Sequence, residues 1–268
     1  MLTASLVLYH NSIKDVNAVI NCVLNSPIDK LYIIDNSRND AFRILERRSD
    51  RIRYIHNENI GYGGAHNIAI REAIEDGAKF HIVVNPDIYF EDGTVETLAE
   101  YMDYNDSVGW VMPRVVYPNG DIQYLCKPIP TPIDLIFRRF IPKQWFKSYR
   151  DKFELRGFGY DRELNVPFLS GCFMFLRISA LLDVGLFDER FFMYGEDIDL
   201  SRRMHSKYKT MFYPKATIVH AHMAGSYKNR KMLFIHIKNI VRYFNKWGWL
   251  IDKERRCVNK ALFQNIID

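Results

Sequence analysis

The sequence lacks a long uninterrupted apolar run and lacks a targeting segment at its start. Its longest candidate for a membrane span, residues 166–176, meets Arg177 well short of the roughly 18 apolar residues that a spanning helix needs. The N-terminal MLTASLVLYHN has no basic stretch, and its apolar part is too short for a signal peptide. We therefore expect a cytoplasmic protein.

Cysteine is scarce as well, and internal repeats and low-complexity tracts are absent. The four cysteines (Cys22, Cys126, Cys172 and Cys257) are scattered and form no C-x-x-C pair, which argues against a zinc ribbon or a small disulfide scaffold and favours free thiols. Hydrophobic residues make up 48% of the chain and charged residues 26%, so a sizeable core can form. This composition excludes a disordered tail, a coiled coil and a collagen-like fibre.

The positive charge is unevenly distributed. Residues 138–152 hold six basic and one acidic side chain, and residues 228–260 hold ten and two, so the segments carry +5 and +8. The whole chain carries +5, which leaves −8 for the remainder. Both basic segments are rich in aromatic residues, a pattern that fits an anionic membrane surface, a nucleic acid or two solvated faces. Because no RNP-like or helix-turn-helix signature accompanies them, no nucleic-acid partner is expected.

Short apolar segments alternate with helical periodicity at the start of the chain. Residues 4–9, 31–34, 52–56 and 80–84 are typical of strands, whereas 15–24 has apolar side chains at helical spacing. This alternation predicts an α/β domain with a mostly parallel central sheet, flanked by helices, whose ligands bind beyond the carboxyl ends of the strands. The polar residues that follow those ends are His10, Asn11, Asp35, Asn36, Asn57, Asn59, Asn85 and Asp87.

The later segments complete one domain over residues 1–227 and a helical extension over 228–268. Within the domain, residues 122–158 are proline-rich, basic and aromatic, and we interpret them as a long excursion. Further strands are expected in 166–176 and 211–220, and a turn followed by a helix in 187–203. In the extension, Leu233, Ile237, Ile240, Val241 and Phe244 share one helical face. That face is expected to pack on the domain or to lie on a membrane surface.

Two motifs in the N-terminal half have the chemistry of a nucleotide site. Asn85-Pro86-Asp87 follows an apolar strand, and a carboxylate there can bind Mg²⁺ or Mn²⁺, although the same residues also form ordinary turns. Gly61-Tyr62-Gly63-Gly64 precedes a helix, where glycines let a backbone approach a ligand. Its spacing fits neither G-x-G-x-x-G nor a P-loop, and a flexible turn is the alternative.

Two further motifs lie in the C-terminal half. Glu196, Asp197 and Asp199 crowd three carboxylates into the first turn of a helix, where capping explains one or two and a general base is the functional alternative. His220 and His222 alternate at a strand end and therefore face the same way. They are either metal ligands or partly buried structural histidines.

Together these motifs resemble the inverting nucleotide-sugar glycosyltransferases of family 2, especially the rhamnosyltransferase-like branch that builds bacterial surface polysaccharides. The resemblance covers residues 1 to about 230. The segments that carry it are Asp35-Asn36-Ser37, Asn59-x-Gly61-Tyr62-Gly63-Gly64-x-x-Asn67, Asn85-Pro86-Asp87, Gly171-Cys172-Phe173-Met174, the block from Phe187-Asp188-Glu189 through Gly195-Glu196-Asp197-x-Asp199-Leu200 to Arg203, and His220 followed by Ser226.

The resemblance implies a GT-A fold, a nucleotide-sugar donor and a divalent ion, Mn²⁺ or Mg²⁺. Asp87 would be the last acid of the family's Asp-x-Asp motif and ligate the ion, with Asn85 in place of the first acid. Asp197 matches the general base, beside Glu196. His220 matches a late histidine that completes the metal site in some members, with His222 as the competing choice.

The other implied site residues fall into two groups. Those at the nucleotide are Tyr9, Asn11, Asp35, Asn36, Asn59, Gly61, Asn67 and Asn85. Those at the sugar or acceptor are Gly171, Cys172, Trp110 and His222.

The implied reaction moves rhamnose or another hexose from a dTDP- or UDP-linked donor to a hydroxyl of a glycan or a polyprenyl-diphosphate-linked glycan. Such an acceptor would bring the protein to the inner face of the cell membrane as a peripheral protein. A catalytically silent nucleotide- or sugar-binding module of the same fold is the alternative. A nucleotidyltransferase normally has a glycine-rich loop after its first strand, and Tyr9-His10-Asn11-Ser12 contains no glycine.

Overall fold

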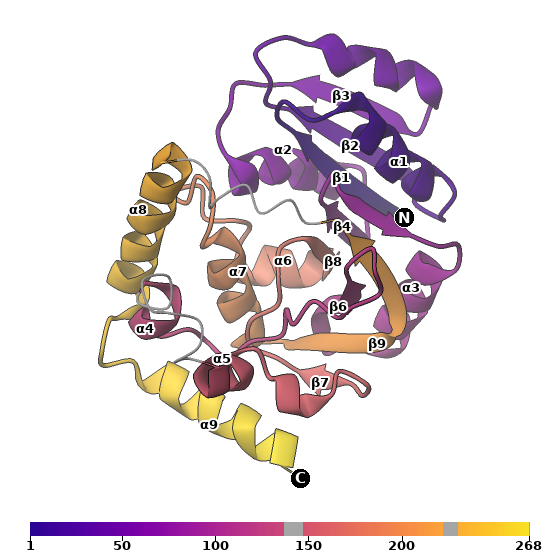
Figure 1. Ribbon diagram of the computed structural model, residues 1–268. Helices are drawn as coiled ribbons and strands as arrows, with labels where there is room; N and C mark the ends of the chain where they lie inside the picture. The colour runs from indigo at the N-terminus through magenta and orange to yellow at the C-terminus, as the bar shows by residue number, and fades with distance from the viewer. Residues whose placement is uncertain (137–146, 222–229, 268) are drawn as a thin grey trace.

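A computed structural model describes residues 1–136, 147–221 and 230–267, in which helices flank a nine-stranded sheet (Figure 1). The sheet order is β3-β2-β1-β4-β8-β6-β9-β5, with β7 paired to β9. The strands are β1 (Leu2–Leu8), β2 (Lys30–Asp35), β3 (Ile52–His56), β4 (Phe80–Val84), β5 (Ile88–Phe90), β6 (Val108–Val116), β7 (Leu164–Asn165), β8 (Phe173–Arg177) and β9 (Lys209–His220).

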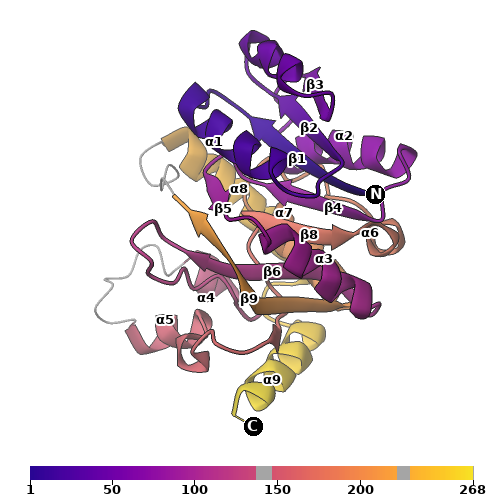
Figure 2. The ribbon, with the colours of Figure 1, turned by 90° about the vertical axis from the view of Figure 1, so that its right-hand side faces the viewer.

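The helices lie on both faces of this sheet (Figure 2). They are α1 (Ile13–Leu24), η1 (Ala41–Arg48), α2 (Tyr62–Glu75), α3 (Thr94–Tyr104), α4 (Pro132–Leu135), α5 (Lys147–Phe153), η3 (Arg156–Phe158), α6 (Ile178–Val184), α7 (Glu196–His205), α8 (Arg230–Trp247) and α9 (Lys253–Ile267). Within the described ranges, none of these helices is both long and apolar enough to cross a bilayer.

The N-terminal half of the sheet is parallel, as the alternating pattern predicts. β1 lies between β2 and β4, and β2 pairs with β3, all in parallel register. Ser12 is the N-cap of helix α1, and its Oγ accepts a hydrogen bond from the amide of Asp15 at 3.2 Å. It buries Val16, Val19, Ile20 and Val23 against the sheet. The carboxyl ends of β1 to β4 therefore meet at one edge.

Beyond β4 the sheet also contains antiparallel pairs, although six of its nine strands (β1 to β4, β6 and β9) run in the same direction, as predicted. β8 is antiparallel to both β4 and β6, while β6 and β9 are parallel to each other. Residues 166–172 form a loop, so only the second part of the apolar segment 166–176 is a strand. An apolar sequence predicts that a strand is buried, but it does not predict the direction of that strand. The direction depends on the edge at which the preceding loop enters the sheet.

The excursion 122–158 contains α4 and α5 and packs against the C-terminal helix. Thr131 and Asp134 form a capping box at α4. Asn259 of α9 accepts from the amide of Ile129 at 2.8 Å and donates to its carbonyl at 2.9 Å. The aromatic and basic residues predicted for a membrane interface at positions 137–146 lie outside the described residues.

Candidate functional site

One edge of the sheet collects most of the predicted site residues. The carboxyl ends of β2, β4 and β9 place Asp35, Asn85 and His220 there, and the loop before β8 adds Gly171 and Cys172. β8 runs the other way, so its amino end meets the carboxyl end of β4, with Val84 opposite Phe173. The mixed half of the sheet thus delivers residues to the same edge as the parallel half.

The nucleotide-binding candidates after β2 form a buried polar cluster. Asp35 accepts hydrogen bonds from the Tyr54 hydroxyl at 2.7 Å and the Ser37 amide at 2.9 Å. The Asn36 Nδ2 lies 3.4 Å from both Asn59 Oδ1 and Gly61 O. The Asn36 Oδ1 is buried without a hydrogen-bond partner in the described part of the chain. Because such an oxygen is costly to bury, it favours a ligand donor at this place.

The candidates after β1 lie at the rim of this cluster. Asn11 accepts a hydrogen bond from the amide of Tyr9 at 2.8 Å, and the Tyr9 side chain is exposed. The His10 amide donates to the Ser37 hydroxyl at 3.2 Å, which links this loop to the residues after β2. A ligand on the Asp35 side of the edge would therefore meet Tyr9 and Asn11 from the solvent side.

Asn67 does not face the nucleotide cluster. Its Nδ2 donates to Phe187 O and to Glu189 Oε1, both at 2.9 Å, and its Oδ1 accepts from the Phe187 amide at 3.0 Å. These three hydrogen bonds tie α2 to the turn at residues 187–189. We therefore correct its assignment from nucleotide binding to holding this turn.

The glycines at the start of α2 allow another segment of the chain to pack closely against this helix. Gly61 has φ +89°, and a Cβ there would lie 2.1 Å from Phe192 O, while the Tyr62 amide donates to that same oxygen at 2.8 Å. A Cβ on Gly63 would lie 3.0 Å from the Phe187 Cβ and 3.5 Å from the Glu196 Cβ. The structure thus explains these glycines by the close approach of the segment that leads into α7.

Asp87 and His220 come together at the ends of β5 and β9, with Asp87 Oδ1 3.4 Å from His220 Nε2. The Nδ1 of His220 lies 2.9 Å from Gln123 Oε1, and Gln123 Nε2 donates to the His220 carbonyl at 2.7 Å. Burial opposes protonation of His220, but hydrogen bonds with Asp87 and Cys172 outweigh it and raise its pKa to about 10. Metal-binding histidines commonly have their other ring nitrogen held by a hydrogen-bond acceptor, and Gln123 Oε1 holds Nδ1 in this way, which leaves Nε2 on the side of Asp87.

These two residues fit a divalent cation that a ligand helps to bind. No cluster of three or more His, Cys, Asp or Glu side chains suited to a metal occurs among the described residues. Mg²⁺ and Mn²⁺ are commonly held by one or two protein ligands together with substrate phosphates. Asp87 and His220 supply such a partial set. The competing ligand, His222, lies outside the described residues.

Tyr62 connects the two sides of the site. Its hydroxyl lies 2.9 Å from Asn85 Oδ1 and 2.8 Å from Gly171 O. The amide of Gly171 in turn donates to Asp197 Oδ2 at 3.2 Å. Burial first, and then the charge of Glu196, raises the pKa of Tyr62 well above its usual value, so the hydroxyl keeps its proton. The sequence contains Tyr62 within the glycine motif but gives no sign of this bridging role.

Replacing Tyr62 by phenylalanine is expected to lower kcat of a reaction at this site by about tenfold, because two partly buried acceptors lose their shared donor. Steady-state kinetics would measure the effect, and thermal unfolding would show that the fold survives. The matched control is Tyr101→Phe in α3, which removes one hydrogen bond, from the Tyr101 hydroxyl to Glu163 at 2.9 Å. Unchanged kinetics in Tyr62→Phe would show that the Tyr62 hydroxyl has no role in the reaction.

The carboxylates of Glu196 and Asp197 begin α7 in different surroundings. Asp197 accepts from the amides of Ile198 at 2.8 Å and Gly171 at 3.2 Å. Burial raises its pKa, while these amides and the charge of Lys127 act in the opposite direction. Glu196 Oε2 is buried without a hydrogen-bond partner among the described residues, and burial followed by the charge of Asp197 raises its pKa well above normal. Of the two, Glu196 is therefore the carboxyl that more readily keeps a proton, and Asp197 is the one that its amide donors favour in the ionised form.

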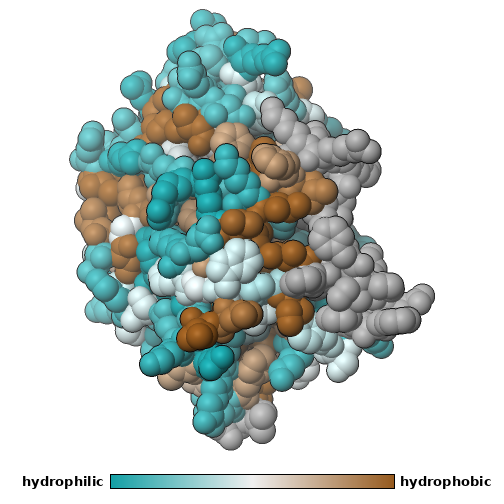
Figure 3. Space-filling model, turned by 90° about the vertical axis from the view of Figure 1, so that its left-hand side faces the viewer, coloured by the Kyte–Doolittle hydropathy of each residue, from teal (hydrophilic) through white to brown (hydrophobic). Residues whose placement is uncertain are grey.

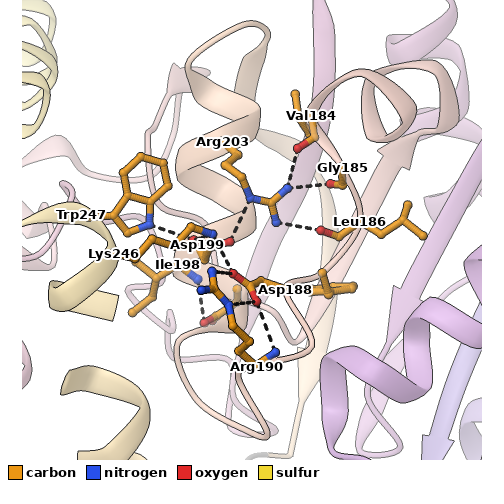
Figure 4. A network of polar contacts seen from close by, with 12 residues as sticks. Val184, Gly185, Leu186, Asp188, Arg190, Ile198, Asp199, Arg203, Lys246 and Trp247 are labelled. Carbon is orange, nitrogen blue, oxygen red and sulfur yellow. Dashed lines mark hydrogen bonds and ion pairs between the residues drawn. The ribbon is translucent and has the colours of Figure 1, made fainter. Parts of the chain in front are cut away.

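Asp199, the third acid of the motif, is structural. Its buried carboxylate binds Arg203 at 2.9 Å, Lys246 at 2.7 Å and Trp247 Nε1 at 2.8 Å (Figure 4). Lys246 also pairs with Asp188 at 2.8 Å. One carboxylate thus joins α7 to the end of α8. The three acids of the motif therefore have different surroundings, and Asp199 is the one held in ion pairs.

Trp110 does not reach this site. It is fully buried in β6 and pairs with Leu176, which lies opposite His81 and thus away from the carboxyl end of β4. Its assignment to the sugar or acceptor is corrected to a core residue. In contrast, two residues of the excursion act on the site without any sequence signal: Gln123 is hydrogen-bonded to His220, and the charge of Lys127 lowers the pKa of Asp197 against the effect of burial.

Comparisons with known proteins agree with this arrangement. The model of the glycosyl transferase family 2 matches residues 6–185. An N-acetylglucosaminyl-diphospho-decaprenol L-rhamnosyltransferase of Mycobacterium tuberculosis is 27% identical over 226 residues, which cover 78% of this chain and 72% of that protein. The rhamnosyltransferase WbbL of Escherichia coli is 25% identical over 234 residues, covering 80% and 81%.

Solved structures share the fold. GalNAc-T7 with UDP, GalNAc and Mn²⁺ superposes with a TM-score of 0.67 at 13% identity and covers 92% of this chain, which spans 48% of that protein. The mannosyltransferase PcManGT of Pyrobaculum calidifontis, in complex with GDP-Man and Mn²⁺, gives 0.59 at 15% identity, covering 91% and 63%. The chain therefore belongs to glycosyl transferase family 2, as a rhamnosyltransferase-like glycosyltransferase of the GT-A fold.

Proposed function

We propose that the protein transfers a hexose from a nucleoside-diphosphate donor to an acceptor hydroxyl with inversion at the anomeric carbon. One observation carries the proposal. Hydrogen bonds run continuously from Asn85, beside Asp87, through the Tyr62 hydroxyl and Gly171 to Asp197. They fix a donor-binding turn and a base relative to each other, as a single displacement requires.

In this mechanism Asp197 removes the proton from the attacking hydroxyl. The backbone amides of Gly171 and Ile198 keep its carboxylate ionised and oriented. Glu196, which retains its own proton, adds no second negative charge where the nucleophile must approach. A displacement that uses one base and forms no covalent intermediate with a carboxylate inverts the anomeric carbon.

Asp87 and His220 would hold a divalent ion against the donor diphosphate, with Asn85 beside them. When bound, such an ion neutralises the negative charge that develops on the departing nucleoside diphosphate. The Mn²⁺ in the GalNAc-T7 and PcManGT structures supports this assignment. Asn36, with its unpartnered oxygen, and Asp35 would face the nucleoside.

The acceptor is proposed to bind in a cavity of about 450 Å³ in the excursion, whose lining includes Gln123 and Lys127. Gln123, Tyr124, Lys127 and Arg156 line part of it, and the Arg156 guanidinium stacks 4.1 Å from the Tyr124 ring centre. Gln123 is bound to His220, and the charge of Lys127 acts on Asp197, so the cavity adjoins both halves of the site. Mixed charges and aromatic rings suit a sugar ring.

The names of the relatives direct the choice of substrates. The mycobacterial relative is a rhamnosyltransferase named for a diphospho-decaprenol-linked sugar, and the Escherichia coli relative is also a rhamnosyltransferase. We therefore propose rhamnose from a dTDP donor, with UDP-hexoses as the second choice. The proposed acceptor is a glycan carried on a polyprenyl diphosphate, which places the protein at the inner face of the membrane.

Calorimetric titration with UDP, dTDP, GDP and CMP, with and without Mn²⁺, tests the donor site. We expect one nucleotide to bind in a Mn²⁺-dependent way and Asp87→Asn to weaken it by at least about tenfold, since even outer-shell metal partners contribute that much. Asp183→Asn, at an exposed aspartate paired with Lys207, is the control. Metal-independent binding, unchanged in Asp87→Asn, would contradict the metal assignment.

A transfer assay separates the enzyme from a silent binding module of the same fold. The assay uses the donor whose nucleotide binds and a water-soluble acceptor glycan, and it follows the release of nucleoside diphosphate. Acceptor-dependent release is the expected result. Binding of nucleotide without any release under these conditions would favour the silent module.

A further inference from the structure

The outer face of α8 carries an exposed apolar row. Phe234, Ile237 and Val241 are 68%, 42% and 36% exposed, and their spacing of three and four residues places them on one helical face. The sequence pattern assigned Ile237 and Val241 to the same face as Ile240 and Phe244. The structure instead buries Ile240, Tyr243 and Phe244 against Phe168, Phe191 and Ile198.

The segment after α8 extends this row. Trp249 folds back and donates from Nε1 to Asn245 Oδ1 at 2.8 Å, and it remains 37% exposed. Leu250 and Ile251 follow with 77% and 79% exposure. The outer strip, as we name it, consists of Phe234, Ile237, Val241, Trp249, Leu250 and Ile251. Figure 3 looks at this side of the molecule, where hydrophobic side chains interrupt the hydrophilic surface. Apolar side chains gathered in this way mark an interaction surface.

The charges around the outer strip are positive. Lys238, Lys253, Arg256 and Lys260 are exposed on α8 and α9. The two acids of the segment, Asp252 and Glu254, both pair with Arg202 of α7, at 2.8 and 2.6 Å. An apolar row flanked by cations complements an anionic lipid surface. A second copy of the chain would bring like charges together, so charge favours lipid over self-association.

The inner face of α8 holds the loop that precedes the base. Asn239 Nδ2 donates to Met193 O at 2.8 Å, and the His236 ring lies 5.0 Å from that of Tyr194. Gly195 follows and leads directly into Glu196 and Asp197. Only the thickness of one helix, roughly 10 Å, therefore separates the outer strip from this loop.

We propose that the outer strip docks the protein on an anionic membrane, with its apolar side chains among the lipid headgroups. This inference rests on the proposed lipid-linked acceptor, since docking through α8 brings the membrane next to the loop that carries Asp197. Docking would also restrict the acceptor to approach from one side.

Sedimentation with lipid vesicles tests the docking surface. The vesicles contain phosphatidylcholine alone or with about 30% phosphatidylglycerol, an anionic lipid. The parent protein should sediment with the anionic vesicles, and Leu250→Ser/Ile251→Ser and Phe234→Ser/Ile237→Ser should each weaken binding about tenfold. Lys253→Gln/Arg256→Gln should weaken only the binding to anionic vesicles. Leu182→Ser is the control, at a 61% exposed leucine of α6, which lies apart from α8 in Figures 1 and 2.

Two further measurements distinguish this inference from the proposed function. The outer-strip variants should keep the thermal midpoint, the Mn²⁺-dependent nucleotide binding and the transfer to a water-soluble acceptor. The docking proposal would be overturned, even with nucleotide binding intact, if the parent protein did not bind anionic vesicles. It would also be overturned if the outer-strip variants bound them as well as the parent. If the parent protein were a dimer, and these variants were monomers with unchanged vesicle binding, the outer strip would instead be the contact with a second copy of the chain.

Discussion

Asp197→Asn is expected to lower kcat for sugar transfer by about 10²–10⁴-fold, the usual contribution of a general base. Asparagine keeps the size of the side chain, and its single oxygen can accept one of the two hydrogen bonds that Gly171 and Ile198 donate to the two carboxylate oxygens. It cannot take a proton from the acceptor hydroxyl. Because the donor turn at Asn85 and Asp87 is untouched, nucleotide affinity should stay within about twofold of the parent.

The pH dependence of kcat provides an independent check on this base. Below its pKa, Asp197 is protonated and cannot act, so the rate should fall about tenfold per pH unit on the acid side. Burial raises the pKa of Asp197, so this fall should begin at a higher pH than the ordinary aspartate value of about 3.9 predicts.

The variant and its control distinguish the base from a bystander. Asp197→Asn should lose the acid limb of the profile along with most of the rate. Glu196→Gln should retain far more activity, because Glu196 already holds a proton. A full-rate Asp197→Asn enzyme, or one with an unchanged acid limb, would show that another group is the base.

Asp199→Asn, two residues further along, should instead destabilise the fold by about 3 kcal/mol. Its buried carboxylate neutralises Arg203 and Lys246 and accepts from Trp247, so its loss leaves two cations poorly paired. We place the cost at the low end of the range for broken buried ion pairs, because Arg203 and Lys246 keep 17% and 25% of their side-chain exposure.

Thermal denaturation would show this loss as a midpoint lower by about 6–10 °C. Asp183→Asn removes one partner of an exposed ion pair with Lys207 and should cost less than about 1 kcal/mol. A midpoint for Asp199→Asn as high as that of the Asp183 control would refute the anchoring role. At temperatures where it is folded, the Asp199 variant should retain more transfer activity than Asp197→Asn.

Sequence reasoning predicted several features that depend on short segments. The strands β1 to β4, the helix after Gly61 and the polar residues beyond the strand ends all follow from local periodicity and turn chemistry. The fold class and the family are confirmed by the matches to glycosyl transferase family 2 and to GT-A structures. The site assignments stay predictions for Asp87, Asp197 and His220, which the structure brings to one edge of the sheet.

Other assignments failed where a contact distant in sequence decides the role. Asn67 looks like a ligand-binding amide until the turn at 187–189 is placed against it. Trp110 looks like a sugar platform until the register of β6 puts it in the core. On α8 the apolar pattern is broad enough to fit two faces, and only the packing of Phe168 and Phe191 selects the buried one.

The strands and helices of the N-terminal half, the sheet edge expected to bind ligands and the residue types at that edge could be predicted from the sequence. These depend on side-chain periodicity and on turns a few residues long. The proposed division of Glu196, Asp197 and Asp199 into proton holder, base and anchor depends instead on contacts that form only in the folded chain. Burial, amide donors and paired cations set those roles, and Gly171, Arg203 and Lys246 supply them from elsewhere in the chain or fold.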